Sequence, residues 1–167
     1  VHLRDRAASA SHVGYPVPLG ARFKLHEALA PVFFFDADKG FDSWLRTTDF
    51  DPSEQQKVLF GEAAASVRRD GYIVIERKAG FTMDQAGYDE AIVTSATDLP
   101  IQVATEISDG RVYSIASIMS PVSDEKGRVS FALGITGFYS TMSAERVRHA
   151  GQQLREACDR ISDFIAG

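Results

Sequence analysis

The sequence predicts an α+β fold: a curved, mostly antiparallel sheet of roughly five or six strands, covered by helices and followed by a long C-terminal helix. Three stretches carry this prediction, a β-hairpin, a capped helix and an amphipathic helix. The hairpin, between Val112 and Gly137, has two apolar arms around the polar cluster 123–127. Its Asp can accept local backbone hydrogen bonds and its Gly can adopt positive φ, as a hairpin loop requires.

We expect this hairpin to lie at the centre of the sheet, because nearly continuous apolar arms are typical of strands covered on both faces. Small residues are interleaved among the large ones, namely Ala116, Ser117, Ser120, Ala132 and Gly134. Small side chains on one face of a sheet leave space for close packing or for a ligand cavity.

The N-terminal third carries weaker patterns. Weak alternation predicts a first hairpin from strands at 1–7 and 12–17, which prolines place at the edge of the sheet. Helical spacing from Leu25 predicts a short helix or turn that is kinked at Pro31. A second short helix is expected at 41–47, carrying the only tryptophan.

A strong helix start follows. Asp51 can cap the free N–H groups, a proline suits the first helical position, and Glu54 completes a capping box. The helix is expected over 52–70, ending at Gly71, with a strand at 72–76. Its apolar face is formed by Val58, Leu59, Ala63 and Val67.

The remaining elements are a loop, a strand and a helix. A long ordered loop is expected over 77–100, because glycines and aspartates break any periodic pattern there. A strand is expected over 101–107, followed by a turn that leads into the central hairpin. The last helix is expected from a cap at Ser143 to about Ala166. Its apolar stripe is Val147, Ala150, Leu154, Ala157, Cys158, Ile161 and Ile165. This stripe would cover the sheet, although its seven-residue spacing also suits a dimer seam.

The composition is that of one ordinary globular domain, with 167 residues of which 44% are hydrophobic and 25% charged. A formal net charge of −5 gives no electrostatic footprint for nucleic acid on this chain alone. A single cysteine, Cys158, predicts a reducing cytoplasm, and neither a membrane span nor a signal peptide is evident. The first residue is Val, which leaves room for a missing N-terminal domain.

No pattern in the sequence predicts catalysis or a cofactor. Phosphate-binding loops, dinucleotide fingerprints, paired cysteines and zinc-protease motifs are all missing from the sequence. The four histidines are scattered, so no metal site is expected, and Cys158 falls on the buried stripe of the last helix as an inert thiol. The pattern that remains is a curved sheet with small residues, which can enclose an apolar cavity with a few polar contacts.

Four short motifs follow one another in the chain: Leu25-His26-x-Ala28, the helix end 68–72, the strand 117–122 and the return strand 134–137. Together they resemble the effector-binding domain of the IclR-type bacterial transcription regulators, from about Gly20 to the C-terminus. The resemblance implies that 1–167 is a single effector-binding domain with a GAF-like (profilin-like) fold. It also implies a small organic effector, assembly as dimers and tetramers, and a separate winged helix-turn-helix domain that binds DNA.

The resemblance places the effector site at Leu29, Ala30, Glu106, Ser117, Gly134 and Thr136. The Ser117 hydroxyl would bond a carboxylate or hydroxyl of the ligand. On the return strand, Thr136 keeps an oxygen while Gly134 offers backbone and extra room. N–H groups of the first helix turn, at Leu29 and Ala30, would point at the anionic end of the effector. Glu106 corresponds to an acidic residue before the central strand.

The chain departs from the family at several of these motifs. Pro31-Val32 replaces Gly-Lys, which removes a cation and an N–H donor, Met119-Ser120 replaces Ala-Ala, and Phe138 replaces a proline. The long loop would supply a lid with Phe81, Met83 and Tyr88. These departures predict a larger, more apolar ligand, such as an aromatic acid or its conjugate.

Two other classes of function stay open. A GAF-like module with a cavity filled by its own side chains would act only by dimerising, without a small-molecule ligand. A small hydrolase would need a nucleophile beside a base, for which Ser117 and His26 are the nearest candidates.

Overall fold

The computed structural model describes residues 25, 27–36, 40–46, 51–78, 101–138 and 140–167. Its elements are α1 (Ala30–Phe34), α2 (Gly40–Leu45), α3 (Glu54–Asp70), β1 (Ile73–Arg77), β2 (Ile101–Ala104), β3 (Val112–Tyr113), β4 (Ile115–Ser123), β5 (Val129–Thr136), β6 (Met142–Ser143) and α5 (Ala144–Ala166). The predicted N-terminal hairpin, and nearly all of the predicted loop 77–100 with its lid residues, lie outside the described part of the chain.

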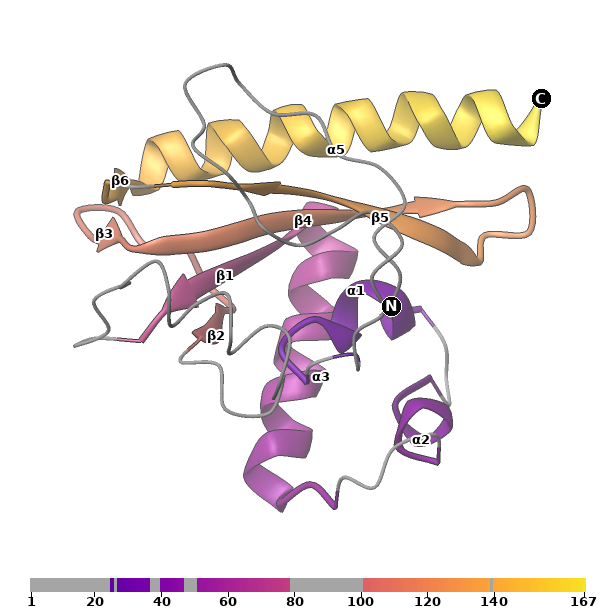
Figure 1. Cartoon of the computed structure of the whole chain (residues 1–167), viewed down its shortest axis with the longest axis horizontal. Helices are drawn as coiled ribbons and strands as arrows, with labels where there is room; N and C mark the ends of the chain where they lie inside the picture. Colours follow the sequence, from indigo (N-terminus) through magenta and orange to yellow (C-terminus); the bar gives the residue numbers. More distant parts are fainter. Residues whose placement is uncertain (1–24, 26, 37–39, 47–50, 79–100, 139) are drawn as a thin grey trace.

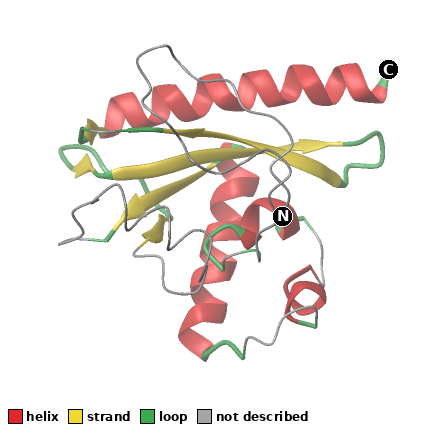
Figure 2. Ribbon diagram, viewed as in Figure 1, coloured by secondary structure: helices red, strands yellow, loops and turns green. Residues whose placement is uncertain are grey.

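The main sheet of the described residues has four strands in the order β2-β1-β4-β5, and every neighbouring pair is antiparallel. A small second sheet pairs β3 with β6. Helix α5 lies across one face of the main sheet, while α1 and α3 lie on the other face (Figures 1 and 2). The predicted α+β class is therefore confirmed, and the arrangement is consistent with a GAF-like fold.

The β4–β5 hairpin forms where it was predicted. Its loop begins at Asp124, whose carboxylate accepts from the N–H groups of Lys126 and Arg128, and Gly127 adopts the expected positive φ of 72°. Among the described strands, β4 is interior, beside β1, and β5 lies at the edge, so the central place is observed for one arm of the hairpin. Strand order depends on β1 pairing with β4, which hairpin chemistry does not determine.

Two apolar cores lie on the two faces of the sheet. The α5 face includes Tyr72, Val74, Tyr113, Ile118, Val122, Val147, Leu154 and Cys158. The opposite face includes Ala28, Val32, Ala63, Val67, Ile73, Ile75 and Ala116. The dimer-seam interpretation of α5 is wrong for Val147 and Leu154, because both side chains are buried inside the chain. Ile165, predicted on the same stripe, is exposed.

Two predicted helix starts need correction. Pro31 stands in the first turn of α1, where its missing N–H is harmless, so it begins a helix and does not kink one. The cap of α3 is Ser53, and the reciprocal partner is Gln56, where Asp51 and Glu54 were predicted. At the other end of α3, Gly71 adopts the expected left-handed conformation.

Two further differences concern burial and length. Val58 and Leu59, predicted on the apolar face of α3, are exposed, because the N-terminal half of α3 extends past the sheet (Figure 1). Strand β2 ends at Ala104, three residues short of the predicted Ile107. No helix in the described ranges is long and apolar enough to cross a membrane.

Candidate functional site

Three of the six predicted site residues come together on the sheet face that α1 covers. The register pairs Ser117 with Thr136 and Met119 with Gly134 across the β4–β5 ladder. Directly opposed residues share a face of the sheet, and Met119 packs with the core beneath α1 and α3. Ser117, Gly134 and Thr136 therefore project towards α1. We use the name acid face for the surface formed by Ser117, Gly134, Thr136 and Arg77. Arg77 is described below.

Neither hydroxyl of the acid face is fully buried. Thr136 is exposed and Ser117 is half-buried, so the described core does not enclose either hydroxyl completely. A Cβ at Gly134 would meet Met119 Cγ at 3.4 Å. The Met119 side chain thus takes up much of the room that the absence of a side chain at Gly134 was expected to leave.

Leu29 and Ala30 stand at the start of α1, which packs on β4 and β5. Leu29 packs at the edge of the core beneath α1, and its carbonyl accepts from the Val32 N–H. The Ala30 side chain is completely buried, so it can face a ligand only through its backbone. The structure therefore places these residues beside the acid face, with helix α1 closing one side.

Arg77, at the end of β1, is a residue that the sequence analysis missed. It pairs with Ile101 and shares its side of the sheet with Ile75 and Ile101, which belong to the core beneath α1 and α3. Its Nε is buried and has no hydrogen-bond partner among the residues that the structure describes. The alternation of Ile73, Ile75 and Arg77 along β1 was the signal that could have placed a cation on this face.

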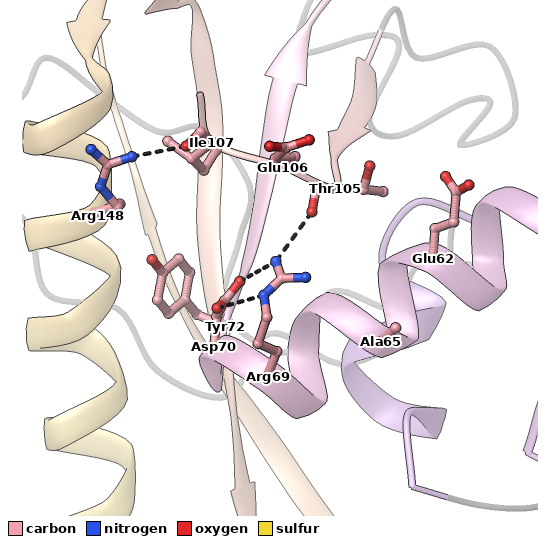
Figure 3. Close-up of a pocket in the computed structure, with 9 residues that line it drawn as sticks. All are labelled: Glu62, Ala65, Arg69, Asp70, Tyr72, Thr105, Glu106, Ile107 and Arg148. Atoms are coloured by element: carbon pink, nitrogen blue, oxygen red, sulfur yellow. Dashed lines mark hydrogen bonds and ion pairs between the residues drawn. The ribbon is translucent and has the colours of Figure 1, made fainter. Parts of the chain in front are cut away.

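Glu106 lies elsewhere, in a surface groove of about 540 Å³ that opens between α3, the segment after β2 and α5 (Figure 3). The groove is lined by Glu62, Ala65, Arg69, Asp70, Tyr72, Thr105, Glu106, Ile107 and Arg148. None of the other predicted site residues lines it. The structure therefore separates Glu106 from the acid face.

Both arginines of the groove are held by acceptors of the chain. Arg69 donates to the Asp70 carboxylate at 3.0 and 2.6 Å and to the Thr105 carbonyl at 3.3 Å. Arg148 donates to the Ile107 carbonyl at 2.8 Å and pairs with Asp109. The hydrogen bond to Asp70 raises the pKa of the Arg69 guanidinium, and the hydrogen bond to Asp109 raises the pKa of the Arg148 guanidinium.

Tyr72 forms the boundary between the groove and the core. Its ring packs on Gly151 of α5 so closely that a Cβ there would lie 2.3 Å from Tyr72 Cε2. Burial, and then the charge of Asp70, raises the pKa of the Tyr72 phenol. The hydroxyl therefore stays protonated at neutral pH, as both a hydrogen-bond donor and an acceptor.

Several buried polar groups away from the groove and the acid face have structural partners. The buried Glu76 carboxylate accepts from Arg111 at 3.0 and 2.7 Å, and the Arg111 guanidinium lies 4.4 Å from the centre of the Tyr113 ring. Ser120 donates to the Gly71 carbonyl at 2.7 Å. Burial raises the pKa of the Cys158 thiol, as expected for an inert core cysteine.

No group of His, Cys, Asp and Glu that could hold a metal ion occurs among the described residues. The hydrolase interpretation requires His26, which lies outside the described part of the chain. Within that part, Ser117 has no hydrogen bond to a histidine.

Comparison with known proteins gives a structural likeness. No family model matches the chain, and no curated protein matches it. Among solved structures, it is similar to the Agobacterium tumefaciens repressor BlcR, with 14% sequence identity and a TM-score of 0.48 over 91% of this chain and 50% of that chain. The chain thus spans about half the length of that repressor. A likeness at this level does not assign the chain to a family.

Proposed function

We propose that this chain is the effector-binding domain of an IclR-type transcription regulator, and that its acid face binds a small organic acid. The observation that carries the proposal is the register of β4 and β5, which puts two hydroxyls, of Ser117 and Thr136, side by side on one sheet face. Arg77 adds a guanidinium to the same face. Two hydroxyls and a cation are a suitable set of groups for a carboxylate.

Arg77 supplies the positive charge that the motif after the first helix turn lacks. A cation at position 32 would be of little use in this chain, because the Val32 side chain is completely buried in the core. A buried guanidinium nitrogen without a partner is costly, since desolvation is not repaid by a hydrogen bond. A ligand carboxylate can accept from two guanidinium nitrogens at once and removes that cost.

The apolar surroundings favour an acid with a ring or a branched chain. Met119 and Ala132 pack on this side of β4 and β5, and Leu29 and Phe33 border it from α1. An aromatic acid would bury its ring against these side chains, whereas a short oxoacid would leave them exposed. Burial of apolar ligand surface contributes about 25 cal/mol per Å².

A thermal-shift screen tests the proposal. Benzoate and phenylacetate should stabilise the chain more than glyoxylate and pyruvate do. An acid at 100 times its dissociation constant should raise the free energy of unfolding by about 2.7 kcal/mol over the ligand-free chain. Stabilisation by the short oxoacids alone would reject the aromatic-acid hypothesis.

Three variants locate the site on the acid face. Arg77→Leu, Ser117→Ala and Thr136→Val should each weaken binding, Arg77→Leu by about tenfold or more because a charge-assisted bond is lost. Matched controls are Ser130→Ala, exposed on β5, and Arg160→Leu, exposed on α5. If the controls lose as much binding as the three variants, the acids bind at another site.

The proposal extends to the full-length protein. There the acid would change the affinity of a separate winged-helix domain for DNA, and the protein would act in the cytoplasm as a dimer or tetramer. Gel-shift titration of the full-length protein with its upstream DNA, with and without the stabilising acid, tests this step. An acid that binds the domain and leaves DNA affinity unchanged would contradict it.

One observation favours a second candidate, a GAF-like dimerisation module without a small-molecule ligand. Met119 already packs beside Gly134, where the effector was expected to find room. This candidate predicts that no acid stabilises the chain, while sedimentation shows a dimer. The hydrolase interpretation has no such support among the described residues.

A further inference from the structure

The groove defined above is distinct from the acid face, because it shares none of the acid-face residues. It is formed by the C-terminal half of α3, the segment after β2 and one face of α5 (Figure 3). We propose that this groove is a second binding site, and that it accepts an ammonium or guanidinium group carried on a short alkyl chain.

The free charges of the groove are negative. Its lining holds three carboxylates, of Glu62, Asp70 and Glu106, and two guanidinium groups. Both arginines already have carboxylate partners: Arg69 pairs with Asp70, and Arg148 pairs with Asp109. Glu62 and Glu106 form no ion pair among the described residues. An incoming anion would have to displace a carboxylate of the chain, whereas a cation finds two carboxylates without an ion-pair partner.

The Tyr72 hydroxyl is a second, independent observation that indicates a ligand. Only 8% of this residue is exposed, it lines the groove, and its hydroxyl has no hydrogen-bond partner within the described structure. The ring is buried in the core, and the hydroxyl oxygen is the part of this side chain that opens into the groove. The N–H of a bound cation would donate to this oxygen, because a phenol is protonated at neutral pH and burial raises the pKa of Tyr72 further.

The size and the remaining surface of the groove set the ligand class. A volume of about 540 Å³ falls in the range of small-molecule sites. Ala65 and Ile107 provide apolar surface for the methylene groups of an alkyl chain. The ligand is therefore a small aliphatic amine or guanidine, or the side chain of a lysine or arginine, since both sources present the same cationic group.

A nuclear magnetic resonance titration of the whole chain tests this proposal. Agmatine represents the free small cation, and N-acetylarginine methylamide represents a protein side chain. Either should shift the amide signals of Tyr72, Thr105 and Ile107 in a saturable way, more strongly at low salt. Hexanoate, which has a similar alkyl chain and the opposite charge, should leave these signals unchanged.

Matched variants connect the response to the groove. The double variant Glu62→Gln and Glu106→Gln should weaken agmatine binding about tenfold or more, as expected for the loss of charge-assisted bonds. Glu125→Gln, which removes an exposed carboxylate of the hairpin loop, should leave binding unchanged. Tyr72→Phe keeps the ring and tests the hydroxyl alone.

The proposal is overturned if neither cation gives a saturable shift, or if the double variant binds agmatine as tightly as the natural chain. Preferential binding of hexanoate would also overturn it. These outcomes are independent of the acid screen, because the acid-face variants leave every groove residue in place.

Discussion

Replacing Gly151 by Ala should destabilise the chain, although alanine is the better helix former. A Cβ at this position would lie 2.3 Å from Tyr72 Cε2 and 2.4 Å from Tyr72 Cζ. The ring would have to retreat by about 1 Å to reach an ordinary carbon–carbon separation of about 3.5 Å. Its burial opposes that movement, since Tyr72 lies in the core beneath α5.

The size of the effect follows from two opposing contributions. Overpacking a filled core costs about 1–3 kcal/mol. The higher helix propensity of alanine stabilises the helix by about 0.5–1 kcal/mol relative to glycine. The net loss in the free energy of unfolding is therefore about 0–2.5 kcal/mol, and for a chain of this length each kcal/mol lowers Tm by about 2–4 °C. Urea unfolding followed by circular dichroism measures it.

Gly61 provides a matched control, because it is also inside a helix but a Cβ there would meet nothing within 4 Å. Gly61→Ala should stabilise the chain by about 0.5–1 kcal/mol through propensity alone. The two substitutions therefore have opposite expected signs. A stabilising Gly151→Ala would refute the close contact between Tyr72 and α5.

Three further predictions concern caps, a buried charge and a thiol. Ser53→Ala should cost about 1 kcal/mol in thermal unfolding and Asp51→Ala less, because Ser53 is the observed cap; the reverse order would restore the sequence-based assignment. Arg111→Leu should cost about 2–4 kcal/mol in urea unfolding, because it leaves the buried Glu76 carboxylate without its partner; a loss below about 0.5 kcal/mol would indicate an ordinary surface pair. Burial raises the pKa of the Cys158 thiol, so its contribution to stability is complete below the unfolded value of about 8.5 and is lost as pH rises above it. Cys158→Ala should flatten this decline between about pH 8 and 9.5, and an unchanged slope would exclude the thiol as its cause.

The elements that local chemistry determines could be predicted from the sequence. Helix α5 begins at its predicted cap, Ser143, and the hairpin loop closes around Asp124. The cap of α3 was misassigned because Asp51 and Ser53 are both good caps, and the choice rests on Gln56. That side chain accepts from the Ser53 N–H and also donates to Glu27, a contact between distant segments that no local pattern records.

The residues of the candidate site also differ in whether local or tertiary contacts determine their positions. Because a hairpin loop fixes the register of its strands, the sequence could place Ser117 opposite Thr136. Glu106 and Arg77 depend on how β1 and β2 are ordered beside that hairpin, which is a matter of tertiary pairing. Period-2 alternation puts Arg77 and Ile75 on the same face of their strand, but this becomes the face of Ser117 only once β1 is known to pair with β4.

Strand β1 explains why the two proposed sites can act separately. Tyr72 precedes the strand and Arg77 ends it, so their backbones are about 16 Å apart at roughly 3.3 Å per residue. Sites separated by more than about 10 Å that share no partners usually contribute additively. Tyr72 packs on the α5 side while Arg77 shares the opposite side with Ile75, so the sheet itself stands between the two groups. A cation in the groove would therefore change the affinity of the acid face by shifting or stiffening β1, the strand that connects Tyr72 with Arg77.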